Sequence, residues 1–177
     1  AIMPVRGALG VRTVFNVLGP LTNPAAPPYQ LIGAFSSDAA KLMADTLAGM
    51  PIERAFVVHG EPGWDEATPA GDFVLYDVRP GSVAESSRSP EDYGLQRCKP
   101  DALRGADAAH NAKELARVLT GEDQGAHRDA LVMGTSLVLE VVGIASDLHD
   151  GVAQATAALD NGDAAKFLDD FRQHFSA

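Results

Sequence analysis

Two adjacent acids, Asp65 and Glu66, are the residues whose types and spacing most directly point to chemistry. They stand in a loop rich in glycine and proline, directly after an apolar run, residues 54–59, that predicts a buried strand. In open α/β sheets, ligands bind outside the carboxyl ends of the strands, so a functional group is expected in this loop. Paired carboxylates offer the hard oxygen ligands that Mg²⁺ binds together with a phosphate. Taken alone, however, such an acidic pair is more often ordinary solvated surface.

The first region of the chain contains two further candidates, a pair of arginines and a rigid dipeptide. Arg6 and Arg12 lie among apolar neighbours, where a guanidinium can bind a carboxylate through two hydrogen bonds. The alternative is a surface arginine whose stem packs on the core, and the residues alone do not separate the two. Gly19 and Pro20 can form a wall without bulky side chains against which a planar ligand fits, although such a pair is more often only a turn.

The remaining polar candidates carry less weight. His59 ends the predicted strand and is placed to act as a general base, but a structural histidine is the more frequent case. Cys98 has cationic neighbours that can lower a thiol pKa, yet no base partner is visible, which favours an inert thiol. The sequence has no G-x-G-x-x-G loop, Walker lysine loop or G-x-S-x-G elbow. Four histidines without metal-ligand spacing receive no role: His110, His127, His149 and His174.

The elements that must position these residues alternate in type. Residues 30–35 predict a short strand, a Ser36-Ser37-Asp38 cap predicts the start of a helix, and 54–59 predict the next strand. A strand, a helix and a strand joined by short loops are typical of a βαβ crossover, so a mainly parallel sheet flanked by helices is expected. Residues 73–78 predict a further strand at a sheet edge.

The chain from about Asp107 onward is predicted to be helical, with helices over 108–119, 129–142, 151–161 and 164–175. At the other end, residues 11–18 fit a short buried helix or strand, and the Gly19–Pro24 segment predicts a rigid turn. No internal repeat or long linker occurs. The predicted fold class is therefore one α/β unit with a helical C-terminal part.

Composition limits the possible partners. Lys and Arg number 14 against 24 Asp and Glu, giving a net charge of −10, which argues against a general nucleic-acid grip but not against binding one small anion. Hydrophobic residues make up 46% and charged residues 21%, as in a globular chain with a core. No apolar run reaches the roughly 18 residues of a membrane span. A single cysteine fits a reducing compartment, so we expect a cytoplasmic protein without membrane partners.

The residues from Pro4 to Pro24 resemble the anthranilate phosphoribosyltransferase family. The stretch from Arg12 onward reads R-T-x-F-N-x-L-G-P-L-T-N-P, a long and specific pattern. Similarity continues through the strand at 30–35, the G-x-D-E loop at 63–66 and the segment 90–95. The chain departs from the family near Gly134 and Thr135, where Asn-Ala is common.

This resemblance implies an activity and a role for five of the candidate residues. The family transfers the phosphoribosyl group of phosphoribosyl pyrophosphate to anthranilate in tryptophan biosynthesis, with release of pyrophosphate and with Mg²⁺ as cofactor. By position, Arg6 matches the arginine that binds the anthranilate carboxylate, and Gly19 and Pro20 match residues that line the channel of the aromatic substrate. Asp65 and Glu66 match the acidic pair that holds Mg²⁺.

Other parts of the family pattern have no counterpart here. The glycine-rich phosphate loop, a second metal-binding segment, the Lys-His-Gly loop and the N-terminal helical domain through which the family forms homodimers all precede the matched region. Residues 1–177 are therefore expected to be the C-terminal part of the phosphoribosyltransferase α/β domain, inactive alone. Two alternatives stay open: a transferase or phosphorylase of the same fold with another acceptor, and a non-catalytic paralogue that acts as a binding module.

Overall fold

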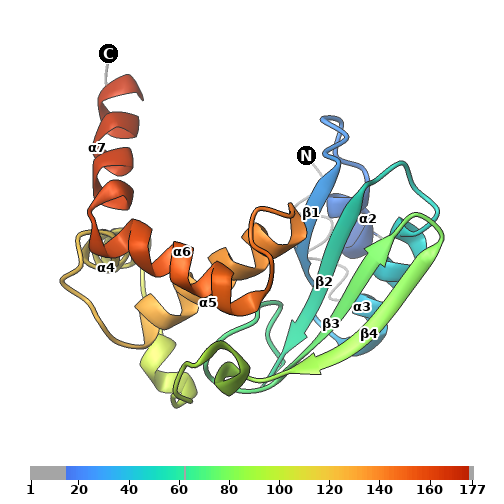
Figure 1. Ribbon diagram of the computed structural model, residues 1–177, viewed down its shortest axis with the longest axis horizontal. Helices are drawn as coiled ribbons and strands as arrows, with labels where there is room; N and C mark the ends of the chain where they lie inside the picture. The colour runs from blue at the N-terminus through green and yellow to red at the C-terminus, as the bar shows by residue number, and fades with distance from the viewer. Residues whose placement is uncertain (1–14, 62, 176–177) are drawn as a thin grey trace, which may run out of the picture.

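The computed structural model describes residues 15–61 and 63–175, which contain a four-stranded sheet in the order β1-β2-β3-β4 with the C-terminal helices on one side of it (Figure 1). The strands are β1 (Tyr29–Gly33), β2 (Arg54–Gly60), β3 (Phe73–Arg79) and β4 (Ser82–Arg88). β1 and β2 are parallel, whereas β2–β3 and β3–β4 are antiparallel. The α/β class is confirmed, but the prediction of a mainly parallel sheet is wrong for these strands.

The loop and turn after β2 explain the antiparallel pairings. The described residues of the connection from β2 to β3, 61 and 63–72, contain no helix, and the chain returns beside β2 in the opposite direction. β3 then turns directly into β4 through Pro80 and Gly81, and Gly81 has a φ of 73°. β3 is therefore an inner strand, not the predicted edge. The edge is β4, whose sequence SVAESSR lacks the apolar alternation by which strands are recognised.

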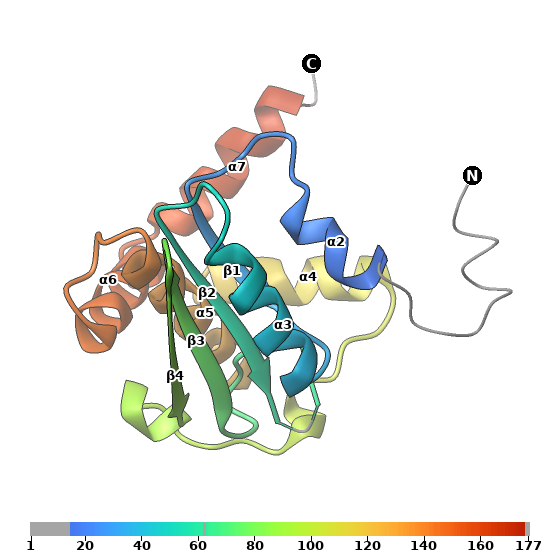
Figure 2. The same cartoon turned by 90° about the vertical axis from the view of Figure 1, so that its right-hand side faces the viewer.

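Helix α3 (Ser37–Leu47) joins β1 to β2 and confirms the predicted crossover. The side chain of Ser36 accepts a hydrogen bond from the Ala39 amide, which caps the first turn as expected. The buried residues of this helix pack on one face of the sheet, against Ile32, Val57 and Val78. The opposite face of the sheet carries Phe56, Val58 and Leu75 and packs on helix α5 (Ala126–Val141). Figure 2 shows α3 and α5 on opposite sides of the sheet.

The C-terminal part is helical, as predicted. α4 (Ala108–Leu119) has the predicted bounds, and α6 (Leu148–Asp160) packs closely on α5. α7 (Asp163–Phe175) extends away from the sheet (Figure 1). Two short 3₁₀ helices, Pro90–Tyr93 and Pro100–Leu103, connect β4 to this part. Within the described residues, none of these helices combines the length and the apolar character needed to cross a membrane.

The N-terminal elements differ from the predicted turn. α2 (Phe15–Leu21) is a short helix that includes Gly19 and Pro20, so the predicted turn over Gly19–Pro24 is wrong for its first residues. Pro20 stands in the last turn of this helix, where its missing amide donor removes one intrahelical bond, and the helix ends at the next residue, Leu21. The chain leaves the helix at Thr22, whose amide donates to the Leu18 carbonyl at 2.9 Å.

Candidate functional site

The loop that carries Asp65 and Glu66 is held at the carboxyl end of β2. The Gly60 amide donates to the Trp64 carbonyl at 2.9 Å, and the Trp64 amide donates to the Gly60 carbonyl at 2.9 Å. This reciprocal pair forms an isolated bridge between the two residues. Gly63, with a φ of 109°, makes the tight turn that brings the chain back on itself. The acidic pair therefore follows immediately after a fixed anchor.

The backbone of this loop also lies directly on the ends of β1 and β2. A Cβ atom placed on Gly33 would lie 1.7 Å from the carbonyl oxygen of Asp65. A Cβ atom placed on Gly60 would lie 2.1 Å from the carbonyl oxygen of Glu66. The predicted position of the acids, outside the carboxyl ends of neighbouring strands, agrees with this arrangement.

Two adjoining cavities open beside the acidic pair. Both are lined by Asp65, Glu66 and Ala130, so the loop forms one wall and the N-terminal half of α5 forms another. The first has a volume of about 260 Å³ and includes Gly33 and Gly134 in its lining. The second has a volume of about 340 Å³ and extends toward Trp64 and His127. The carboxyl ends of β1 and β2 thus adjoin space for a small ligand.

The two carboxylates fit a divalent cation. Both residues are exposed, and within the described part of the chain neither side chain has a hydrogen bond or an ion pair. Carboxylate oxygens that are free, adjacent and open to water are the ligands that Mg²⁺ prefers, since the ion keeps several of its waters. A cavity beside them leaves room for those waters and for a phosphate.

The sequence of residues 1–165 matches the family described as glycosyl transferase family, a/b domain. The chain belongs to this family. It is 46% identical over 170 residues to an anthranilate phosphoribosyltransferase from Rubrobacter xylanophilus, an alignment that covers 96% of this chain and 50% of that relative. The chain thus spans about half the length of the curated relatives it matches.

Solved structures of similar proteins confirm the fold. The anthranilate phosphoribosyltransferase of Thermus thermophilus has a TM-score of 0.86 and 38% identity, with 98% of this chain and 51% of that chain covered. The Saccharomyces cerevisiae enzyme in complex with PRPP and Mg has a TM-score of 0.84 and 26% identity, with 95% and 48% covered. The acidic loop therefore lies within a fold that this chain shares with these solved structures.

The structure does not bring Gly19 and Pro20 to the acidic pair. Pro20 lines a separate cavity of about 60 Å³ with Ile52, near the start of β2. Gly19 is exposed on α2, and an added Cβ atom there would meet nothing within 4 Å. Arg6 and Arg12 lie outside the described residues. Asp65 and Glu66 are thus the predicted site residues that the structure of this glycosyl transferase domain places together.

For His59 and Cys98, the structure favours a structural role over a catalytic one. Nδ1 of His59 lies 2.7 Å from the Ala34 carbonyl oxygen, a contact that favours the tautomer with its hydrogen on Nδ1. Burial raises the pKa of the Cys98 thiol, with Asp129 adding to the effect, so the thiolate is disfavoured. The cationic neighbours of Cys98 in the sequence therefore do not produce a net lowering of the pKa of its thiol.

His127 is the residue that sequence reasoning missed. It lines the cavity beside Glu66 and a neighbouring cavity of about 390 Å³. Its Nδ1 lies 3.4 Å from Asp123, and its ligand atoms, with those of Asp123 and Glu114, lie within 4.8 Å of one another. Arg117 donates to Glu114 at 2.7 Å, so a cation already balances part of this acidic charge. The four-residue spacing of Asp123 and His127 was the available signal.

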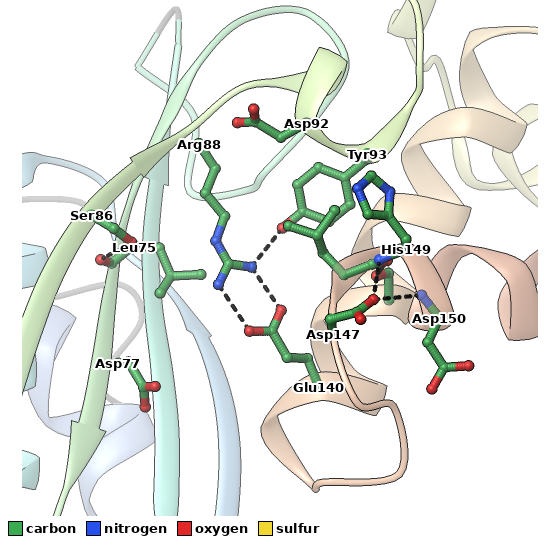
Figure 3. A network of polar contacts seen from close by, with 12 residues as sticks. Leu75, Asp77, Ser86, Arg88, Asp92, Tyr93, Glu140, Asp147, His149 and Asp150 are labelled. Atoms are coloured by element: carbon green, nitrogen blue, oxygen red, sulfur yellow. Dashed lines mark hydrogen bonds and ion pairs between the residues drawn. The ribbon is translucent and has the colours of Figure 1, made fainter.

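A charged network fixes α5, which forms one wall of the cavities. Arg88 donates to both carboxylate oxygens of Glu140, at 2.7 and 2.8 Å, and to the Tyr93 hydroxyl at 2.9 Å (Figure 3). Arg54 donates to the backbone carbonyl of Glu140 at 2.7 Å and binds Asp77 through two hydrogen bonds. Glu140 raises the pKa of Arg88 above its ordinary value. The end of α5 is therefore tied to both β2 and β4.

Proposed function

We propose that residues 1–177 are part of the α/β domain of an anthranilate phosphoribosyltransferase. The whole protein would transfer the phosphoribosyl group of phosphoribosyl pyrophosphate to anthranilate. The observation that carries this proposal is the loop with Asp65 and Glu66, laid on the carboxyl ends of β1 and β2 in a chain whose relatives bear that name. The same resemblance supports a cytoplasmic homodimer in the tryptophan pathway.

The reaction requires that the two substrates be placed correctly and that the negative charge of the departing pyrophosphate be neutralised. The lone pair of the anthranilate nitrogen forms a bond to C1 of the ribose, and the bond from C1 to the pyrophosphate oxygen breaks with its electrons on that oxygen. The nitrogen then loses one proton to water. An aromatic amine is already a nucleophile, so the step needs no strong general base. Orientation of the two reactants is the main contribution of the protein.

Asp65 and Glu66 are the residues that would hold Mg²⁺ at this site. The bound ion would offset the negative charge of the departing pyrophosphate. Their open carboxylates and the adjoining cavity of about 260 Å³ support this role. Arg6 would bind the anthranilate carboxylate, and Gly19 and Pro20 would line the path of the acceptor. The roles of these last three residues rest on the family resemblance.

A fusion protein tests the proposal directly. This chain would be joined to the part of the Rubrobacter xylanophilus relative that it does not align with, and loss of anthranilate fluorescence would be followed with phosphoribosyl pyrophosphate and Mg²⁺. We expect turnover by the fusion and none by the 177-residue chain alone. A folded fusion that binds phosphoribosyl pyrophosphate but leaves anthranilate unchanged would overturn the proposed acceptor.

One observation favours a second candidate, a transferase of the same fold with a different acceptor. Gly134 on α5 lines the cavity beside the acidic pair and contributes no side chain to it. A Cβ atom at this position would meet nothing within 4 Å, so the cavity is wider there than a larger residue would leave it. Turnover of nucleobases or other aromatic acids by the same fusion, in preference to anthranilate, would select this alternative.

A further inference from the structure

Gly33 and Gly60 touch the acidic loop where no side chain fits. Neither glycine has a positive φ, so the backbone conformation itself is open to other residues. Space is the restriction: an added Cβ on Gly33 would lie 1.7 Å from the Asp65 carbonyl oxygen and 2.7 Å from its carbonyl carbon. These are backbone atoms, which cannot turn aside by a rotamer change. Any side chain at Gly33 must therefore displace the loop or the strand.

The strand is the less movable of the two. Gly33 is paired with Val58 in the parallel β1–β2 ladder, and Val58 is buried against α5. The loop, in contrast, is exposed at Asp65 and Glu66. On its N-terminal side the loop is anchored by the reciprocal hydrogen bonds between Gly60 and Trp64. A displacement forced at Gly33 is therefore concentrated in the residues just after Trp64, which are the two acids.

We infer that Gly33 is a positioning residue, whose missing side chain lets the loop backbone rest on the end of β1 and directs the Asp65 and Glu66 carboxylates toward a divalent cation. Gly60 serves the neighbouring position in the same way, since its Cβ would lie 2.1 Å from the Glu66 carbonyl oxygen. Consecutive loop carbonyls thus rest on adjacent parallel strands. The part of this inference that concerns the cation rests on the proposed function, whereas the position of the loop does not.

Gly134 offers a matched control. It lines the same cavity as Gly33, Asp65 and Glu66, but from α5. An added Cβ there would meet nothing within 4 Å. Gly33→Ala and Gly134→Ala are therefore the same chemical change at two walls of one cavity, and only the first should move the loop.

Trp64 supplies a readout of the loop that is independent of any ligand. It is the single tryptophan of the chain, it is half-buried, and it lines one cavity together with Asp65 and Glu66, so a displacement of the two acids changes its surroundings even though its own backbone is anchored. We expect Gly33→Ala to shift the emission maximum of Trp64 and increase its quenching by acrylamide. Gly134→Ala should leave both unchanged. A wild-type Trp64 spectrum in folded Gly33→Ala would overturn the inference.

Metal binding separates this inference from the proposed function. Binding of Mn²⁺ to the chain, measured from the electron paramagnetic resonance signal of the free ion, should be about tenfold or more weaker in Gly33→Ala and unchanged in Gly134→Ala. If Trp64 shifts but the wild-type chain binds no Mn²⁺, the loop position is upheld and the metal role of the proposed function fails. If Mn²⁺ binds equally to all three proteins, the positioning role fails.

A second variant covers the case in which Gly33→Ala does not fold. Inserting one glycine between Trp64 and Asp65 lengthens the loop beyond its anchor and lets it rise from the strand end. Because the obstruction lies between the new methyl group and the loop backbone, this insertion should restore the folding of Gly33→Ala, as judged by circular dichroism. An insertion that restores nothing would overturn the inference.

Discussion

Arg88 on β4 binds both carboxylate oxygens of Glu140 on α5, at 2.7 and 2.8 Å, with side chains only 18% and 13% exposed. This bidentate pair joins the edge strand of the sheet to the helix that forms a wall of the candidate site. When one partner of such a poorly solvated ion pair is removed, the remaining charge loses its hydrogen bonds and cannot replace them with water. The pair therefore yields a sharp test of how α5 is held.

Removing the Arg88 side chain should destabilise the protein strongly. We expect Arg88→Ala to lower the free energy of unfolding by about 3 kcal/mol, because the poorly solvated Glu140 carboxylate loses both of its hydrogen bonds to Arg88 and keeps, among the described residues, only the longer ion pair with Arg54, at 4.0 Å. Urea denaturation measures the change. Arg104→Ala is the control, since its ion pair with Asp101 is 76% and 82% exposed and should contribute less than about 1 kcal/mol. Equal effects of the two substitutions would contradict this account.

The close contact between α5 and α6 gives a second prediction. A Cβ on Gly151 would lie 2.5 Å from Oγ of Ser136 and 3.1 Å from its Cα. Gly151→Ala should therefore cost about 1–3 kcal/mol of stability through overpacking. Ser136→Ala removes the nearest atom, so the double variant should lose less stability than the sum of the two single variants. Strict additivity in urea denaturation would argue against the contact.

The strands and helices of this domain were largely predictable, and the reason is burial. β2 and β3 are buried on both faces between α3 and α5, and β1 is half-buried beside them, so their sequences are largely apolar runs. β4 was not predicted, because a strand at the edge of a sheet is largely open to water and does not need an apolar run. Gly19 and Pro20 were interpreted as a turn because they usually break helices, whereas α2 includes both residues and ends directly after Pro20, at Leu21.

The candidate site was predictable only on the loop side. Asp65 and Glu66 follow a recognisable strand, and adjacency in the sequence brought them together. The opposite wall comes from α5, whose residues Ala130 and Gly134 carry no chemical signal and reach the loop only through the tertiary fold. The role of Gly33 could not be predicted for a related reason, since a close approach between two backbone segments leaves no pattern in a single sequence.

The acidic pair should control the dependence of activity on magnesium. In the fusion protein described above, Asp65→Asn is expected to lower kcat/KM at least about tenfold and to raise the Mg²⁺ concentration needed for half-maximal rate. Removal of the metal with a chelator should abolish turnover in both proteins. Glu85→Gln, an exposed acid on β4, is the control for the loss of one negative charge and should behave as wild type.

Asp123 should make stability depend on pH in the acidic range. The Gly125 amide, which donates to this carboxylate at 2.8 Å, and His127 hold the pKa of Asp123 below its usual value of 3.8. Because the folded pKa is the lower one, the stabilisation is present above the unfolded pKa and is lost as the pH falls through the folded pKa. Asp123→Asn keeps an acceptor for the Gly125 amide but cannot ionise. The wild-type chain should therefore lose more stability below pH 3.8 than this variant does, as measured by urea denaturation across the pH range.

Arg6 distinguishes the two candidate acceptors, because a guanidinium contributes binding energy only where the acceptor has a carboxylate to pair with it. If anthranilate is the substrate, Arg6→Ala in the fusion protein should raise the KM for anthranilate about tenfold or more and leave the KM for phosphoribosyl pyrophosphate unchanged. Arg6→Lys should restore only part of the effect, since an ammonium group cannot form the bidentate pair. An acceptor without a carboxylate would be used equally well by the wild type and by Arg6→Ala. Steady-state kinetics with anthranilate and with aniline, which differ by that one group, therefore separates a carboxylate receptor from a surface arginine.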